Sequence, residues 1–370
     1  MARSSKGANR LGDFLGNLRR VEFSNLRIFY GLKMGVFMMI LLTIGLVFNH
    51  EVIFATLGTL FIAGTSMLVL EQQRSQQSKI NTLMVISVIN ASTFTIGSVV
   101  ATTGFLVVPL SALVLFLLSY AEVFPDNIVF IACLTFSVGV GQSVGDTIAI
   151  GEHFLLVIVG GLWGILGSII PTPHSISKPK PKAEYLPIQP PHPKVTYKEW
   201  LKPLSSNLSL RSESLRFALT FAATGAIGLL IAVDLGLQKQ YWVLITICII
   251  FLRANISTIF SFISMRIIGT IAGAAIASVI TTYVNIPAVL LSFVFPFATM
   301  HLAASRVNYI LATFLLTTFM LVLLNILSPG QTLLAQTRIL DTVIGAALAL
   351  AGLFVLWSVS HWKKSEIFSL

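Results

Sequence analysis

Charged residues are scarce in this sequence. Asp, Glu, Lys and Arg make up only 10% of the 370 residues, whereas 55% are hydrophobic. A soluble globular domain carries about 25% charged residues, so the composition excludes an ordinary soluble enzyme or binding module. Apolar runs long enough to cross a bilayer recur along the chain, and they predict an all-α polytopic membrane protein.

Cysteine is equally rare, and the motifs of metal and nucleotide chemistry are missing. Cys133 and Cys248 each lie inside an apolar run, which is typical of small buried side chains and indicates neither a disulfide nor a metal site. The sequence has no Gly-x-x-x-x-Gly-Lys-Ser/Thr loop, no metal-spaced His/Cys cluster and no Ser/His/Asp set. We therefore expect no metal, no cofactor and no enzymatic activity. Uphill transport would have to draw on an ion gradient or on a separate partner.

The net charge of +10 does not indicate nucleic acid binding, because the basic residues lie in particular segments. They collect in an N-terminal arm (1–28), a central segment (172–212) and a C-terminal tail (361–370). This distribution follows the positive-inside rule, so we expect these segments and both termini on the cytoplasmic side of the membrane. The arm has the spacing of a basic helix on the membrane surface and lacks the apolar core of a signal peptide.

About six hydrophobic runs precede the central segment and about six follow it, at ~17–25 residues per crossing. We expect a first six-helix half at 29–171, a Pro/Lys-rich linker at 172–212 and a second six-helix half at 213–360. The runs centre on 29–47, 52–70, 80–103, 105–121, 126–144, 153–171, 214–233, 240–252, 259–283, 287–304, 308–327 and 334–359. The run 240–252 is short for a full crossing.

The two halves resemble each other in outline. Each opens with basic residues and ends in a Gly/Ala-rich run. An even number of crossings makes them parallel repeats related by a pseudo-two-fold axis along the membrane normal, with a natural pathway between them. Asp146 and Glu152 fall in a Gly-rich turn between the fifth and sixth runs, and we expect them to lie in a loop.

One arginine interrupts an apolar run of the second half. In Arg266-x-x-Gly269-Thr270-x-x-Gly273, all four residues share one helical stripe. Glycines at this spacing let another helix come close, so Arg266 and Thr270 face protein or water rather than lipid. A central arginine costs about 2.5–3.5 kcal/mol on insertion scales, and such a residue usually has a partner or a purpose.

A second stripe repeats this spacing some 70 residues later. It reads Arg338-x-x-Asp341-Thr342-x-x-Gly345, with a carboxylate where the first stripe has a glycine. Glycine at the last position again favours close helix packing.

Three interpretations of Arg266 and Arg338 remain open at this point. They attract an anion along a polar pathway, they pair with a carboxylate such as Asp341 or with helix-end carbonyls to lock the halves, or they reach the nearer membrane face. Measured from the helix ends, Arg266 lies about two turns from the cytoplasmic end and Arg338 about two turns from the outer end. We therefore expect them at two levels of a path and not in one site. Arg253 ends its run and suits either an interfacial anchor or a pathway residue.

Several elements of the second half follow one another in a specific order. Tyr241-Trp242 opens a short run, Arg-Ala-Asn-Ile-Ser-Thr occupies 253–258, and Tyr309 with Thr317-Thr318 lies between the two arginine stripes. In this order and over about 110 residues, the second half resembles the membrane domain of the fusaric acid resistance (FUSC-like) family, also called the aromatic acid exporter family. The first half resembles it only in its pattern of spans and lacks both arginine stripes.

The resemblance implies an inner-membrane exporter of small organic anions, such as aromatic carboxylates, driven by the proton gradient. It also implies a periplasmic adaptor protein as partner and leaves homo-oligomerisation open. The implied pathway residues are Arg266, Thr270, Arg338, Asp341, Thr342 and Arg253, with Gly269, Gly273 and Gly345 packing the helices. The alternatives are an organic-anion channel of similar architecture and a membrane scaffold without transport. Many relatives carry large cytoplasmic domains after each half, and this sequence has only a linker and a short tail there.

Overall fold

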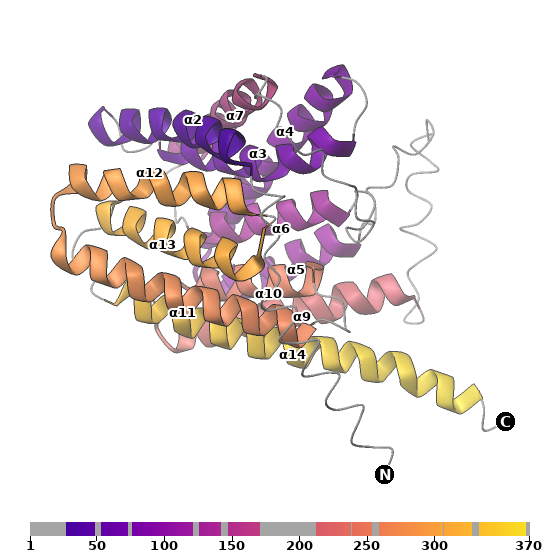
Figure 1. Cartoon of the computed structure of the whole chain (residues 1–370). Coiled ribbons are helices and arrows are strands. Elements are labelled where there is room, and N and C mark those ends of the chain that lie inside the picture. Colours follow the sequence, from indigo (N-terminus) through magenta and orange to yellow (C-terminus); the bar gives the residue numbers. More distant parts are fainter. Residues whose placement is uncertain are drawn as a thin grey trace, which may run out of the picture.

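The helices of this protein follow the apolar runs closely. A computed structural model describes residues 27–48, 53–72, 76–120, 126–141, 147–170, 212–237, 239–253, 259–305, 307–327 and 333–367, and within these ranges it contains no β-strand (Figure 1). The first half contains α2 (Ile28–Val47), α3 (Ile53–Gln72), α4 (Gln76–Ala101), the 3-10 turn η3 (Gly104–Leu106), α5 (Val107–Tyr120), α6 (Asp126–Val140) and α7 (Thr147–Ile169). The second contains α9 (Glu213–Asp234), α10 (Tyr241–Arg253), α11 (Ile259–Tyr283), α12 (Pro287–Ala304), α13 (Tyr309–Leu327) and α14 (Leu334–Ile367).

Not every one of these helices is long enough to cross a bilayer. By length and composition, 8 helices in the described part of the chain qualify as membrane spans. Four more apolar helices are shorter, at Ile53–Ser66, Gly104–Tyr120, Ile128–Val140 and Tyr241–Leu252. The prediction of an all-helical, multi-pass membrane protein is confirmed, and the expected shortness of the run at 240–252 is confirmed as well.

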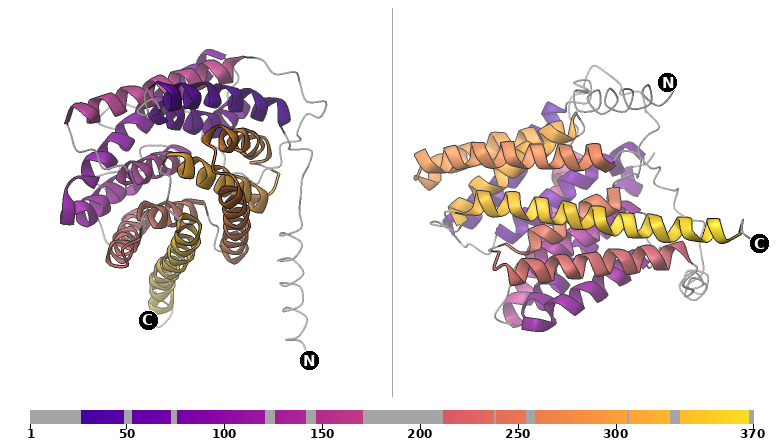
Figure 2. Two further views of the ribbon diagram at one scale, coloured as in Figure 1. Left: turned by 90° about the vertical axis from the view of Figure 1, so that its left-hand side faces the viewer. Right: turned by 90° about the horizontal axis from the view of Figure 1, so that it is seen from below.

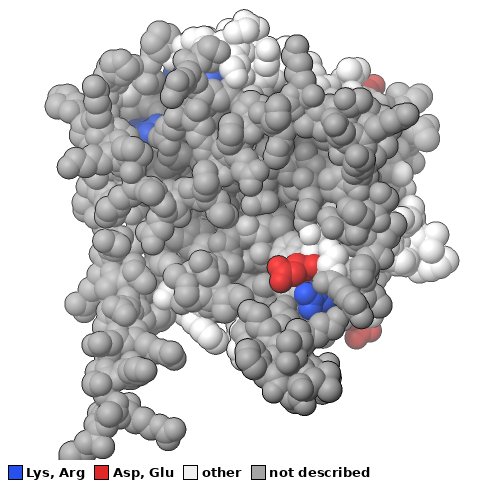
Figure 3. Space-filling model, turned by 90° about the vertical axis from the view of Figure 1, so that its right-hand side faces the viewer, with Lys and Arg blue, Asp and Glu red and all other residues white. Residues whose placement is uncertain are grey.

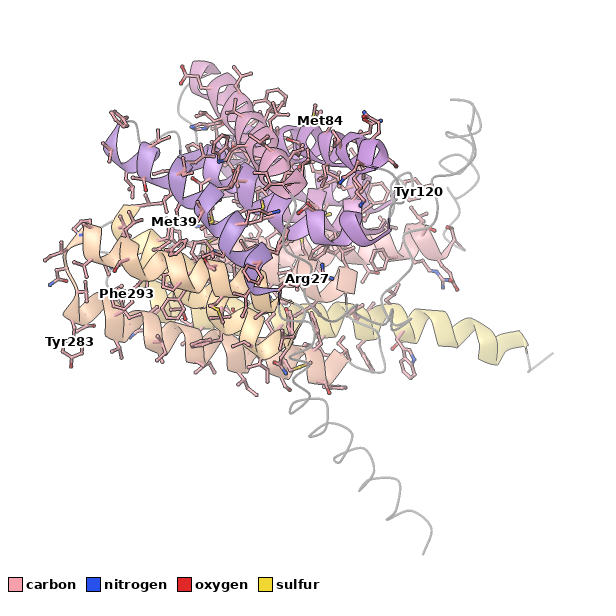
Figure 4. The ribbon with its side chains drawn as sticks, turned by 45° about the horizontal axis from the view of Figure 1, so that its top comes forward. Arg27, Met39, Met84, Tyr120, Tyr283 and Phe293 are labelled. Atoms are coloured by element: carbon pink, nitrogen blue, oxygen red, sulfur yellow. The ribbon has the colours of Figure 1, made fainter. Side chains whose placement is uncertain are left out.

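The outer surface of the bundle is apolar. Large hydrophobic side chains are exposed on α2, α4, α5, α7, α9, α11, α12 and α14, among them Phe29, Leu155 and Phe260. On the described part of the face in Figure 3, acidic and basic side chains lie next to each other in one group. A helix that is apolar on all sides is suited to lipid. Tyr283, the last residue of α11, is 82% exposed and projects from the end of the bundle (Figure 4), as aromatic residues do at a membrane–water interface.

Within each half, the helices pack in a similar manner. In the first half α4 lies against α6 and α7, and α3 lies against α7. In the second half α11 lies against α13 and α14, and α10 lies against α14. The first-half helices α2, α3, α4 and α7 lie on one side of the molecule, with α11 and α14 on the other (Figures 1 and 2).

The halves meet along three helix pairs: α2 with α12, α5 with α9, and α6 with α10. One hydrophobic core crosses this boundary and joins side chains of α5 and α6 to those of α9, α10 and α14. Cys133 and Cys248 lie in this core and are fully buried, as expected. Both are free thiols. At the α2–α12 contact, Gly31 and Gly35 face the backbone and side chain of Thr299.

Some expectations fall outside the described residues, and one is wrong. Two predicted segments lie almost wholly outside the described ranges: the interfacial helix in the arm at 1–28 and the linker at 172–212. Asp146 lies outside them as well. Glu152 was expected in a loop but lies inside α7, because the helix already begins at Thr147. The helix α14 continues to Ile367, into the segment expected to be a tail.

Candidate functional site

Arg266 lies on the face of α11 that packs against α13. A β-carbon placed on Gly269 would lie 2.7 Å from the carbonyl oxygen of Ile310, and one on Gly273 would lie 2.6 Å from that of Phe314. Both distances are too short for a side chain, so the two glycines are what allows α13 to approach. The approach is strengthened by Thr318, whose hydroxyl donates to the Gly273 carbonyl at 3.2 Å.

This packing buries the Arg266 side chain, which is only 2% exposed. Its Nη1 donates to the hydroxyl of Tyr309 at 3.0 Å, and its Nη2 donates to Oγ1 of Thr246 at 3.4 Å. The Tyr309 ring is held in turn by stacking on Phe262, with 4.3 Å between ring centroids. The Nε of Arg266 has no hydrogen-bond partner among the described residues. Arg266 is therefore fixed by neutral hydroxyls.

Arg338 is positioned by the contact between α14 and α10. A β-carbon on Gly345 would lie 2.8 Å from Cβ of Thr246 and 2.9 Å from the carbonyl oxygen of Val243, so α14 lies very close to α10. Two turns earlier, the Arg338 guanidinium lies over the ring of Trp242, 4.7 Å from its centroid. Arg338 is 8% exposed, and its Nη1 has no hydrogen-bond partner in the described part of the chain.

The two arginines lie nearer each other than the sequence indicated. Trp242, under Arg338, and Thr246, bonded to Arg266, are one turn apart on α10, which is about 6 Å along a helix axis. Arg266 also lies within Coulombic range of Arg338. The two arginine side chains therefore reach neighbouring positions on α10 and lie closer together than the two levels expected from the helix ends. The cause is the shortness of α10, which has 13 residues. Side chains that reach it from different levels of α11 and α14 therefore end close to each other.

Asp341 is the acidic member of this group. It lies one turn after Arg338 on α14 and is 0% exposed. Neither carboxyl oxygen has a hydrogen-bond partner among the described residues, although Arg338 acts on it electrostatically. The geometry therefore does not include a hydrogen-bonded Arg–Asp lock. We call Trp242, Thr246, Arg266, Tyr309, Arg338 and Asp341 the arginine cluster.

The remaining predicted pathway residues lie on the same helices as members of the cluster, α10, α11 and α14. Thr270 is buried on α11, and its hydroxyl has no partner within the described ranges. Thr342 uses its hydroxyl to donate to the backbone oxygen of Arg338 at 2.9 Å. Arg253 is the last residue of α10, and its side chain lies outside the described part of the structure.

Sequence reasoning missed Thr246 as a member of the site, and it used Trp242 and Tyr309 only as marks of resemblance. The detectable signal was the spacing of Trp242 and Thr246, which places both on one face of the short run. Threonine is common in apolar helices and often bonds its own backbone, as Thr246 does with the Trp242 carbonyl at 3.0 Å. The contact between Thr246 and Arg266 depends on how α10 packs against α11, so it could not be predicted from the sequence of either helix.

Chemically, the arginine cluster is a buried cationic site with unused hydrogen-bond donors. The cluster contains two guanidinium groups, from α11 and α14, and one carboxyl group, so positive groups outnumber negative ones. Burying a charge is unfavourable unless it is paired and hydrogen-bonded. The unpartnered Nε of Arg266 and Nη1 of Arg338 are suited to donate hydrogen bonds to an oxyanion. No group of His, Cys, Asp and Glu suited to a metal ion occurs among the described residues.

The fold and the site define a multi-pass helical membrane protein with a buried cationic cluster in its second half. Residues 222–352 match the family model described as fusaric acid resistance protein-like. The match begins in α9, ends in α14 and contains every member of the arginine cluster. The resemblance noted in the sequence is confirmed for this region.

Similar proteins come from several bacteria. The chain is 33% identical over 174 residues to the uncharacterized protein slr1298 of Synechocystis sp., covering 47% of this chain and 22% of that protein. It is 28% identical over 158 residues to the inner membrane protein YccS of Escherichia coli, covering 43% and 22%. It is 27% identical over 171 residues to the uncharacterized protein ORF2 of Neisseria gonorrhoeae, covering 45% and 40%. The matches thus span about a fifth of the first two relatives and two fifths of the third. No solved structure matches the chain.

Proposed function

We propose that this protein transports small organic anions across a bacterial inner membrane and that the arginine cluster binds the anion. The observation that carries the proposal is the pair of buried arginines, Arg266 and Arg338, within Coulombic range of each other and with hydrogen-bond donors unused. An intramembrane ionisable residue usually marks a substrate pathway. The match to the fusaric acid resistance protein-like family supports this reading.

The substrate class is an aromatic carboxylate or a related amphipathic compound. A carboxylate fits the guanidinium donors. The ring of Trp242 lies under Arg338, and the Tyr309 hydroxyl accepts a hydrogen bond from Arg266, so an aromatic side chain adjoins each cation. An aromatic ring placed there gains stacking contacts that an aliphatic acid lacks.

Asp341 is the residue we assign to proton coupling. Its carboxyl oxygens are buried and accept no hydrogen bond from any described residue, so the group is not committed to a structural pair. Acidic residues inside membrane spans commonly carry protons in transporters. We propose that protons and anions move through this site in a coupled manner and that the direction is export.

We propose the following arrangement in the membrane. Both termini, the linker at 172–212 and the tail lie in the cytoplasm, and the halves at 29–171 and 213–360 are parallel repeats. The repeat is supported by the helix contacts: α4 packs on α6 and α7 as α11 packs on α13 and α14, and α2 packs on α12 as α9 packs on α5. The lipid bilayer surrounds the protein, and a periplasmic adaptor or a second copy would complete the assembly.

Two other functions are compatible with a membrane protein of this kind. In an anion channel, the same arginines would line a continuous pore. In a scaffold, they would only join helices. The unpartnered Arg266 Nε and Arg338 Nη1 favour anion binding over a purely structural role, because a structural arginine gains most when all its donors are used.

Efflux of 4-hydroxybenzoate tests the proposal. Cells that express the protein are loaded with the acid, and its initial efflux is measured with and without a pH gradient. We expect Arg266→Gln and Arg338→Gln to lower efflux about tenfold or more, since a charge-assisted hydrogen bond contributes about 1.5–3 kcal/mol. The matched control Lys79→Gln removes a cation from the start of α4 and should export normally.

Each alternative has its own outcome in this experiment. If Arg266→Gln folds normally and exports as fast as the unmodified protein, the anion site is wrong. Flux that is independent of the pH gradient would favour the channel. A complete lack of anion flux would leave the scaffold.

A further inference from the structure

The first half contains a polar counterpart of the arginine cluster, which becomes visible when the glycine contacts of the two halves are compared. In the second half, Gly273 of α11 faces the carbonyl oxygen of Phe314 on α13. In the first half, Gly97 of α4 faces the carbonyl oxygen of Phe136 on α6. Arg266 lies seven residues before Gly273, and Asn90 lies seven residues before Gly97. Asn90 therefore occupies the position of Arg266.

A second pair of glycines gives the second equivalence. Gly345 of α14 faces Val243 on α10, and Gly160 of α7 faces Ala55 on α3. The residues seven positions before these glycines are Arg338 and His153. His153 therefore occupies the position of Arg338.

The ring contacts agree with this register. Trp242 and Phe54 are each the second residue of their helices, α10 and α3. Arg338 lies over the Trp242 ring at 4.7 Å, and the His153 ring lies 3.9 Å from the Phe54 ring, centroid to centroid. Phe54 also contacts Phe94, one turn after Asn90 on α4, at 5.8 Å. The same three-helix arrangement thus presents two arginines in one half and an asparagine and a histidine in the other.

Both first-half residues are buried with polar atoms unused. Asn90 is 1% exposed, and neither its Nδ2 nor its Oδ1 has a hydrogen-bond partner among the described residues. His153 is 7% exposed, and its Nδ1 is also without a hydrogen-bond partner there. A buried amide without partners is costly. Such groups are found where a ligand or water completes them.

We propose that Asn90 and His153, with the rings of Phe54 and Phe94, form a second small-molecule site that takes uncharged aromatic compounds bearing a hydroxyl or carboxamide group. The amide of Asn90 offers two donors and one acceptor, which matches such groups. An anion is disfavoured, because none of these four residues carries a guanidinium or an ammonium group. The choice of aromatic compounds rests on the proposed function, whereas the location of the site does not.

The probe for this site is 4-hydroxybenzamide, which is uncharged and aromatic and carries both polar groups. Its binding to the purified full chain in nanodiscs is measured by titration calorimetry. We expect Asn90→Leu to weaken binding about tenfold or more, as loss of a hydrogen bond does in a dry site. The control Lys79→Gln, near the start of the same helix α4, should leave this affinity within about twofold. Failure of the unmodified protein to bind at millimolar concentrations overturns the proposal, as does equal binding by Asn90→Leu.

Two further measurements separate a ligand site from a structural role. His153→Phe keeps the ring contact with Phe54 and removes Nδ1, so it should weaken binding of 4-hydroxybenzamide without a loss of folded protein. The apparent melting temperature of Asn90→Leu should hold or rise, because an unsatisfied amide is removed. A large fall in melting temperature would mark Asn90 as a structural residue and overturn the proposal.

The two proposals fail in different ways. If the arginine variants export 4-hydroxybenzoate normally while Asn90→Leu loses 4-hydroxybenzamide binding, the proposed function fails and the second site stands. If the arginine variants lose export while Asn90→Leu binds 4-hydroxybenzamide normally, the second site fails alone.

Discussion

Arg266 and Arg338 are buried at a cost that their neighbours offset only in part. Arg266 is held by two hydroxyls and Arg338 by an aromatic face, and none of these partners carries a full negative charge. Asp341 is close in sequence but accepts no hydrogen bond within the described ranges. The three ionisable residues could be predicted from the sequence because they stand out in apolar runs. Thr246 could not, because a hydroxyl residue in a membrane helix is ordinary.

Replacing Arg266 with methionine should stabilise the protein and abolish anion binding. The change removes an incompletely satisfied buried cation and its repulsion from Arg338, and apolar replacements of buried charges are often stabilising by about 1–4 kcal/mol. The apparent melting temperature in detergent should therefore rise. Arg266→Lys, which keeps the charge, should show no such rise. A destabilisation of more than about 2 kcal/mol in Arg266→Met would indicate a structural lock.

Replacing Asp341 with asparagine should uncouple anion movement from protons. Asparagine has nearly the same shape but no titratable proton. We expect 4-hydroxybenzoate to bind with similar affinity and efflux to lose its dependence on the pH gradient. The control is Thr342→Val, since among the described residues the Thr342 hydroxyl bonds its own helix backbone. Unchanged coupling in Asp341→Asn would remove this residue from the mechanism.

At the scale of elements, the helices could be predicted from apolar runs and their close contacts from glycine spacing. The run expected at 259–283 is α11 (Ile259–Tyr283), and that at 287–304 is α12 (Pro287–Ala304). The start of α7 was missed, because the glycines before Glu152 resemble a loop until tertiary packing holds the helix. A glycine stripe indicates that some helix comes close, but it does not identify which helix.

The glycine contacts give a stability prediction with a matched control. In Gly273→Ala the new methyl group would meet the Phe314 carbonyl oxygen, so we expect destabilisation of about 1–3 kcal/mol. At Gly64 of α3, nothing lies within 4 Å of an added β-carbon, so Gly64→Ala should stabilise by about 0.5–1 kcal/mol through helix propensity. Apparent melting temperatures of both variants in detergent provide the comparison. Equal shifts would show that α11 and α13 are not in close contact.

At the scale of the whole molecule, the sequence predicted two halves but not how the helices within one half bring distant residues together. Counting turns from the ends of α11 and α14 placed the two arginines far apart. The short α10 cannot separate them, since Trp242 and Thr246 receive the two side chains one turn apart. A linear count along separate helices cannot reveal this, because it depends on how α10, α11 and α14 pack. The neutral counterparts of the arginines, Asn90 and His153, became recognisable only through that packing.

A double-mutant cycle on anion binding tests the central claim most directly. The affinity for 4-hydroxybenzoate is measured by titration calorimetry for the unmodified protein, Arg266→Gln, Arg338→Gln and the double variant, all in nanodiscs. Because both arginines belong to one cluster, we predict that each single change weakens binding and that the two losses fail to add by about 0.5 kcal/mol or more. Fully additive losses would contradict a shared site, and unchanged affinity in either single variant would contradict an anion-binding role for that arginine.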